Sequence, residues 1–306
     1  MASLKNIKLK ILSYKKTGTV THAMEAVSAV KMRKAQERAL GSRAYAAAAL
    51  SVLERLAGTG DLARHPLLQK RDGVPAVIVI TSDKGLAGSL NSGVIRLAES
   101  LLVGFHLPKT SGVVAAIGRR GAEYFKTRGY DVLVSKENVA DDASEQDVNE
   151  LTQALLKRHE SNHISSVYVV YQNFVSTFEQ KPTIRQIVPI TSAVMGEMIA
   201  GIRPARGKYA PQERKDEAKP PASYTIEPDA DTVLSALLPK LLNVAVFHAL
   251  LENKASEHSA RMVAMKSATD KAKDMTKSFT RIFNRVRQAA ITREVSEITS
   301  GIEAMR

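Results

Sequence analysis

The sequence predicts an α/β protein in which long N- and C-terminal helices form an antiparallel coiled coil, with a βαβ domain between them in the chain. Both ends of the 306-residue chain carry apolar residues at helical spacing with almost no proline, and the middle carries short β-rich runs. Positive charge gathers at the ends: residues 1–45 contain ten Lys/Arg and two Asp/Glu, and residues 231–306 contain twelve and eight. The ends are therefore charged helical arms that need a partner.

The N-terminal arm, residues 1–58, is predicted to be one continuous helix. Its apolar residues recur at helical spacing; they are Leu4, Ile7, Ile11, Met24, Val27, Val30, Ala35 and Ala39. Gly18 lies between Thr17 and Thr19, and glycine and β-branched residues both weaken a helix. We therefore expect this helix to be locally soft at Gly18.

The C-terminal arm, residues 229–306, is also predicted to be helical, with Pro239 in a first short turn or kink. Its apolar stripe consists of Val244, Leu251, Met262, Met265, Ala268, Ala272, Met275, Phe279, Ile282 and Val286. Because exposure of either apolar stripe to water is unfavourable, we expect the two arms to pair as an antiparallel coiled coil. The residues expected in its core are Met24, Val27, Leu251, Met262, Met265 and Phe279.

The body, residues 74–190, has a different pattern. Its β-rich runs are Ala76 to Thr81, Val113 to Ile117 and Val167 to Tyr171, with a further strand expected from Thr183 to Ile190. Helical stretches separate the first three runs, which predicts a Rossmann-like βαβ sheet. Residues 191–228 are expected to form a helix or loop and a polar linker that is rich in Pro, Lys and Glu over residues 203–223.

Several classes of site are not expected. The chain contains no cysteine, which excludes disulfides and thiolate metal sites, and it lacks a long uncharged apolar run that would predict a transmembrane helix. Gly85 and Gly88 follow a strand but match neither GxGxxG nor a Walker motif, so we interpret them as a tight turn. His22, His248 and His258 are interpreted as packing or surface residues. We expect no catalytic residue, metal or cofactor.

Four segments resemble one known family in matching order. They are THAMEAVSAVKMRKA from Thr21, SDKGLAGSLN from Ser82, ASEHSARMVAM from Ala255 and RQAAIT from Arg287. These segments resemble the gamma subunit of ATP synthase, the central rotor shaft of the F1 sector. The resemblance implies a non-catalytic subunit whose coiled coil turns inside a ring of alpha and beta subunits. The resemblance further implies that this subunit couples proton-driven rotation to ATP synthesis or hydrolysis.

The resemblance also implies partners and contact residues. The partners are the alpha, beta, delta and epsilon subunits and the membrane c-ring, and the location is peripheral, on the cytoplasmic face of the bacterial inner membrane. The residues expected to contact beta-subunit loops are Arg287, Gln288, Thr292, Glu294 and Glu297. Asp83, Lys84 and Tyr224 are expected on the epsilon and c-ring side. An acidic lever segment of the beta subunit is expected to meet the basic arms.

Some positions depart from the family's pattern. Arg293 stands where the family commonly has Gln, Lys271 where Asn is usual, and Gly18 with Thr19 where a Gln-Lys pair is found. The first two make the C-terminal arm more basic, and the third makes the first helix softer. These departures concern individual contacts and leave the family assignment unchanged.

Two other functions remain open from the residues alone. A sequence pI of about 9.8 is compatible with a coiled-coil protein that binds nucleic acid or another acidic partner. However, the arms lack interleaved aromatic residues, a zinc finger and a bZIP-type basic cluster, and the family resemblance implies no nucleic acid. A stand-alone βαβ enzyme is the third class, but no convincing catalytic constellation is present. Copurification with two larger nucleotide-binding subunits, or with nucleic acid, separates the first two functions.

Overall fold

The computed structural model describes residues 4–56, 66–69, 71–109, 111–191, 194 and 230–305, with the side chains of residues 39–56, 230, 231 and 234 left aside. The chain divides into two compact units. The helix unit consists of Met1–Ala29 and Arg261–Arg306, and the body unit consists of Val30–Ala260. Helix α1, Leu4–Leu56, and helix α6, Ala230–Ala304, each contribute residues to both units.

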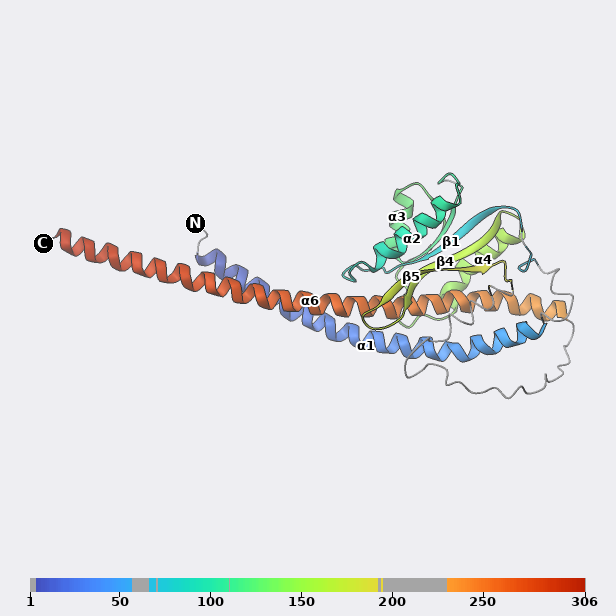
Figure 1. Cartoon of the computed structure of the whole chain (residues 1–306), viewed down its shortest axis with the longest axis horizontal. Coiled ribbons are helices and arrows are strands. Elements are labelled where there is room, and N and C mark those ends of the chain that lie inside the picture. Colours follow the sequence, from blue (N-terminus) through green and yellow to red (C-terminus); the bar gives the residue numbers. More distant parts are fainter. Residues whose placement is uncertain are drawn as a thin grey trace. The chain divides into compact units, whose positions relative to one another are not determined.

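The body unit is built on a five-stranded sheet (Figure 1). In chain order its elements are β1 Val74–Ile80, α2 Leu90–Gly104, β2 Val113–Ile117, α3 Arg119–Thr127, β3 Asp131–Lys136, α4 Gln146–Glu160, β4 Ile164–Phe174 and β5 Gln180–Val188. The strand order is β3-β2-β1-β4-β5, and every neighbouring pair is parallel except the antiparallel pair of β4 and β5. The βαβ sheet and a further strand at its edge were expected, and the structure shows that this edge strand, β5, is antiparallel.

Apolar side chains cover both faces of the sheet. Ala76, Ile78 and Ile80 of β1 belong to a buried cluster that also contains residues of α4 and of α6 up to Leu250. Val77 and Val79 point to the opposite face and belong to a second cluster with residues of α2 and α3. Because successive strand residues alternate between faces, a strand covered on both sides needs a continuous apolar run, and VPAVIVI is such a run.

A close approach of backbone segments fixes the carboxyl edge of the sheet. Gly118, between β2 and α3, has a φ of +94°, and a Cβ atom there would overlap the carbonyl oxygen of Thr81. The Thr81 Oγ1 atom accepts a hydrogen bond from the Gly121 backbone N–H at 2.9 Å. The end of β1 and the start of α3 therefore lie against each other, and this contact positions the loop that follows β1.

The predicted fold class is confirmed, with corrections to individual elements. Strand β3 was not among the expected strands, and β1 and β4 begin before the predicted runs. Pro239 lies inside α6, which is helical on both sides of it, so the expected turn is not present. Of the predicted segment 191–228, only residues 191 and 194 lie within the described residues.

One described helix, α6, is long and apolar enough to cross a membrane by length and composition alone. However, 61% of its most apolar window is buried inside the protein. This burial fits the apolar cluster that α6 shares with the sheet. The composition of α6 is therefore explained by its packing in the body unit.

Candidate functional site

In the helix unit, α1 and α6 pair in opposite directions (Figure 1). Tyr14 stacks on Phe279 with ring centroids 5.4 Å apart, and the hydroxyl groups of Thr21 and Thr269 are 2.7 Å apart. Residue numbers rise along α1 as they fall along α6, so the pair is antiparallel.

Both helices bury one side by alternating steps of three and four residues. In the helix unit, the buried or partly buried run of α1 is Leu4, Ile7, Ile11, Tyr14, Gly18, Thr21, Glu25 and Ser28. That of α6 is Met262, Met265, Thr269, Ala272, Thr276, Phe279, Phe283, Val286 and Ala290. This spacing is the seven-residue repeat of a coiled coil. We call these two sets the seam.

The residues in the middle of the seam are small or polar. A Cβ atom on Gly18 would lie 3.5 Å from the Cβ atom of Ala272, which is ordinary van der Waals contact, so the two helix backbones approach closely there. Thr21 and Thr269 fill the next level with a hydrogen bond that is buried between the helices. Gly18 thus has a packing role inside an uninterrupted helix.

The structure places the expected core residues in three settings. Met262, Met265 and Phe279 are seam residues, and Met24 is partly buried beside the seam. Leu251 is buried, with 2% exposure, but lies in the part of α6 that belongs to the body unit. Val27 is 55% exposed, so its expected core position is corrected: it lies one residue outside the seven-residue repeat that buries Ser28.

A groove with a basic rim runs along the helix unit beside the small residues of the seam. Its volume is about 710 Å³, and its floor includes Gly18, Thr269 and Ala272. Lys15, His22, Lys273 and Lys277 are among the other lining residues. Long cationic side chains around a floor of small residues can hold an acidic segment against the helix pair.

The last turns of α6 are exposed over residues 291–305. The exposed apolar residues there recur at three- and four-residue spacing; they are Ile291, Val295, Ile298, Ile302 and Met305. The expected beta-subunit contacts are all exposed: Thr292, Glu294 and Glu297 lie on this part of α6, and Arg287 and Gln288 lie just before it. Glu297 pairs with Arg293 at 3.3 Å, one turn away on the same helix.

At the carboxyl edge of the body sheet, Asp83 makes hydrogen bonds that connect the loop after β1 to two other backbone segments. Its Oδ1 atom accepts hydrogen bonds from the backbone N–H groups of Arg119 at 3.0 Å and Asn138 at 2.9 Å. Because Arg119 is the first residue of α3, the carboxylate occupies the helix N-terminus where an anion would otherwise bind. The adjacent Lys84 is exposed, and Tyr224 lies outside the described residues.

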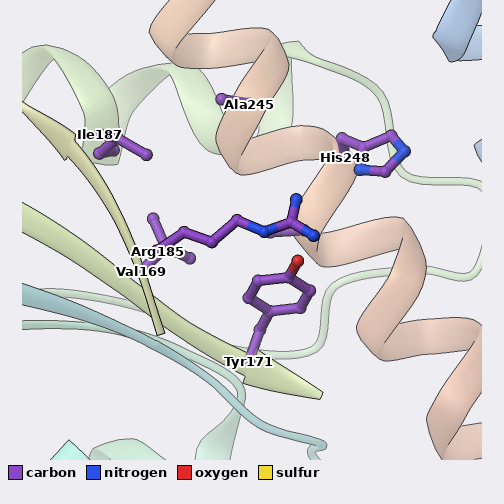
Figure 2. Close-up of a pocket in the computed structure, with 7 residues that line it drawn as sticks. Val169, Tyr171, Arg185, Ile187, Ala245 and His248 are labelled. Atoms are coloured by element: carbon purple, nitrogen blue, oxygen red, sulfur yellow. The ribbon is translucent and has the colours of Figure 1, made fainter. Parts of the chain in front are cut away.

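Figure 2 shows a small cavity between the sheet and α6 in the body unit, lined by apolar residues and by Tyr171, Arg185 and His248. The Arg185 guanidinium lies over the Tyr171 ring, 5.3 Å from its centroid, and His248 of α6 lines the same space. Burial, reinforced by the negative charge of Glu252, raises the pKa of Tyr171. The cavity volume is about 20 Å³, which suits one water molecule and excludes a nucleotide.

The expected surface and packing roles of the histidines are matched by their surroundings. His22 is exposed, whereas His248 and His258 are buried on α6. Within the described part of the chain, no group of three or more His, Cys, Asp or Glu side chains could hold a metal ion. The sequence did not indicate the contact between His258 and Asp141, because the two residues are distant in the sequence.

Asp141, in the loop between β3 and α4, joins four side chains from α1 and α6 in the body unit. Its carboxylate is 2.7 Å from Lys31 Nζ and 3.0 Å from His258 Nε2. Lys254 Nζ lies 3.9 Å from the carboxylate, and Arg38 donates to the Asp141 backbone carbonyl at 2.8 Å. Burial alone would raise the Asp141 pKa, but Lys31, His258 and Lys254 outweigh it and lower the pKa to about 2.

An antiparallel helix pair with exposed basic and apolar surfaces is typical of a coiled-coil subunit of a larger assembly. The family model described as ATP synthase matches residues 3–305. The chain is 37% identical to the ATP synthase gamma chain of Psychrobacter arcticus over 306 residues, with 100% of both chains covered. It is also 37% identical to that of Pelotomaculum thermopropionicum over 308 residues, again with full coverage of both. The chain therefore belongs to the ATP synthase gamma chain family.

Solved structures share the fold. The chain is similar to one in a cryo-EM structure of the Euglena gracilis mitochondrial ATP synthase, OSCP/F1/c-ring, with a TM-score of 0.63 and 17% identity, covering 99% of this chain and 94% of that chain. It is also similar to a chain in the central stalk and c-ring of the Tetrahymena thermophila enzyme, with a TM-score of 0.56 and 19% identity, covering 81% and 99%. The alternative of a nucleic-acid-binding coiled coil is not supported by these comparisons.

The seam yields a prediction about Phe279. Replacing Phe279 by Asp places a charge against Tyr14 and should destabilise the helix pair by about 3 kcal/mol or more. The matched control is Ile282→Asp, because Ile282 is 43% exposed and lies outside the seam. Hydrogen exchange of residues 4–29 should accelerate strongly in the first variant and little in the second. Equal exchange in both variants would show that the seam has been misplaced.

The lowered pKa of Asp141 yields a prediction about acid stability. A carboxylate with a depressed folded-state pKa stabilises the protein above its unfolded pKa, near 3.8, and loses this effect as the pH falls towards about 2. The unfolding free energies of wild type and Asp141→Asn should therefore differ most above pH about 4 and converge near pH about 2. We expect a difference of about 1 kcal/mol, because the side chain is partly solvated.

Urea titrations at several pH values measure this convergence, with Asp142→Asn as the control for loss of one surface charge. A difference between wild type and Asp141→Asn that stays constant from pH about 5 to about 2 would mean that the folded-state carboxylate is not the stabilising species.

Proposed function

We propose that this chain is the rotating central shaft of an ATP synthase F1 sector. The observation that carries the proposal is the full-length match to gamma chains, together with an antiparallel helix pair whose outer surface is basic and apolar. In this role the chain couples rotation driven by proton flow to ATP synthesis or hydrolysis in the surrounding subunits. It links proton flow to the ATP chemistry of the surrounding subunits and needs no active site of its own.

Exposed apolar residues support a partner that encloses the helix unit. Besides the apolar residues at the end of α6, Leu9, Leu12, Val20 and Val27 of α1 are each at least 49% exposed. Exposed apolar stripes on this scale are typical of surfaces that other proteins cover. A ring of alpha and beta subunits around the helix pair is the proposed cover. Val27 then belongs to the outer surface of the shaft.

The basic groove supports a weak, distributed attraction. Exposed pairs between lysine and carboxylate groups contribute about 0.2–1 kcal/mol each. Lys15, Lys273 and Lys277 can therefore hold an acidic beta-subunit segment without creating one deep energy minimum. A shaft that must leave each angular position benefits from such an interaction, because strong specific binding at one angle would stop rotation.

Asymmetry supplies the coupling. A helix pair presents different residues to different directions, so each beta subunit meets a different surface at each angle. A conformational equilibrium shifts only by as much as the two states differ in their contacts with the shaft. Rotation thus changes which state of each beta subunit is favoured, and ATP chemistry in the ring can drive the shaft by the same contacts in reverse.

The non-catalytic role is supported by the carboxyl edge of the sheet. In many α/β proteins this edge binds a nucleotide, with phosphate at a helix N-terminus. Here the carboxylate of Asp83 already lies at the N-terminus of α3. A phosphate group would meet like charge there, so the Gly85 to Gly88 segment acts as a turn.

The proposed surroundings follow from the same role. The alpha, beta, delta and epsilon subunits and the membrane c-ring are the proposed partners, with Asp83, Lys84 and Tyr224 on the epsilon and c-ring side. The proposed location is peripheral, on the cytoplasmic face of a bacterial inner membrane. A cross-linking map of the native complex tests this placement, and cross-links from Lys84 to the interior of the catalytic ring would contradict it.

The non-catalytic role predicts that the isolated chain neither binds nor hydrolyses ATP. Titration calorimetry should detect no stoichiometric binding at micromolar ATP, because Asp83 repels phosphate and the turn lacks a phosphate-binding lysine and hydroxyl pair. Stoichiometric binding, abolished by substitution of Gly85 or Gly88, would reverse the interpretation of this turn.

The contacts near the end of α6 predict a selective loss of coupling. Replacing Arg287 and Gln288 together by Ala should spare assembly, because the rest of the surface stays intact, but should lower rotation-linked ATP turnover about tenfold or more. The matched control replaces Arg281 and Asn284 by Ala, since these are also exposed on α6. Turnover and proton pumping are measured in the assembled complex. If both double variants retain wild-type rates, torque is carried by other residues of the shaft.

A further inference from the structure

In the body unit, the described side chains of α1 and those of α6 make different contacts. Leu238, Leu242 and Val246 of α6 belong to the apolar cluster under the sheet. Among the side chains of α1 that the structure describes, none belongs to either apolar cluster of the body unit. Within the described side chains of α1, Lys31 and Arg38 both contact Asp141 of the loop between β3 and α4.

Lys31 and Arg38 make the contacts from α1 to Asp141. They are seven residues apart, so they lie on the same side of α1. Lys31 contacts the Asp141 carboxylate at 2.7 Å, and Arg38 Nη1 donates to the Asp141 carbonyl oxygen at 2.8 Å. Two cations therefore fix one residue through its side chain and its backbone at once. Such a two-point contact resists rotation of the loop about either bond.

Lys254 and His258, one turn apart on α6, make the contacts from α6 to the same loop. His258 Nε2 lies 3.0 Å from Asp141 Oδ1, and Lys254 Nζ donates to the Val139 carbonyl oxygen at 2.6 Å. Both side chains are nearly buried, with 5% exposure for His258 and 11% for Lys254. Because a buried cation without its partner is costly, the loop cannot leave α6 easily. Asp141 thus bridges α1 and α6.

We propose that Asp141 is a positioning residue that transmits torque between the sheet of the body unit and α1. The inference rests on the proposed rotor function. Torque enters α6 through its apolar contacts with the sheet. Asp141 adds to the seam a polar attachment of α1 that resists slippage along and around α6. The loop between β3 and α4 supplies this attachment, since it is continuous with the sheet and holds both helices through one carboxylate.

A distance measurement tests the attachment directly. The chain contains no cysteine, so Lys34→Cys on α1 and Asn149→Cys on α4 allow selective spin labelling of the full-length chain. Asp141→Asn should broaden the distance distribution between the two labels about twofold, because α1 gains freedom against the body. Asp142→Asn is the matched control: Asp142 is the next residue and is exposed, and it makes none of the four contacts described above. Its distribution should match that of wild type.

A coupling measurement tests the consequence. In the reconstituted ATP synthase, Asp141→Asn should lower the number of protons pumped per ATP hydrolysed about twofold or more, because α1 can slip while ATP hydrolysis continues. Lys31→Gln removes the ion pair between α1 and Asp141 and leaves the contacts from Arg38 and α6 in place. It should have the same direction of effect, and it serves if the Asp141 variant does not assemble. Asp142→Asn should retain the wild-type ratio.

The outcomes separate this inference from the proposed function. If wild type pumps protons and Asp141→Asn and Lys31→Gln match Asp142→Asn in both measurements, the torque role of Asp141 is wrong and the rotor function stands. If the wild-type complex hydrolyses ATP without pumping, the rotor function fails and the inference fails with it. A broadened distance and a lowered ratio, confined to the Asp141 and Lys31 variants, support the inference.

Discussion

The pairing of α1 with α6 is the constraint on which the helix unit depends. Neither helix can bury its own apolar stripe, so each supplies the other's core through steps of three and four residues. The seam is aromatic where Tyr14 meets Phe279 and narrow where Gly18 meets Ala272. The paired helices use only one side of each for this contact. Their remaining surface is free to carry the lysines and exposed apolar residues that the proposed ring would cover.

The sequence predicted the helices and the sheet because their signals are periodic and continuous, and it placed Met262, Met265 and Phe279 on the seam. It misplaced Val27, because hydrophobicity was taken as the sign of a core position. In this seam the corresponding levels are occupied by Thr21 and Ser28, while valine faces outward. Strand β3, DVLVSK, was missed because its polar ends leave only a short apolar run. Pro239 was expected in a first short turn or kink, although α6 is helical on both sides of it.

The Asp141 cluster could not be predicted, since Lys31, Asp141 and His258 are distant in the sequence and meet only after the body unit folds. No local sequence pattern indicates a contact between residues so far apart in the chain. The same limit applies to Asp83, which a motif places near a glycine turn but whose role depends on the backbone of α3. The roles of Arg287 and Gln288 come from the resemblance to the family, since both side chains are exposed on α6.

The central claim is that this chain turns inside its ring. The most direct test is single-molecule observation of an immobilised complex of this chain with its alpha and beta subunits. A bead is attached through Phe178→Cys, because Phe178 is 82% exposed at the tip of the hairpin between β4 and β5 and the chain has no other cysteine. Our account predicts stepwise rotation of the bead in one direction when ATP is added. ATP hydrolysis at the normal rate with a stationary bead would contradict it.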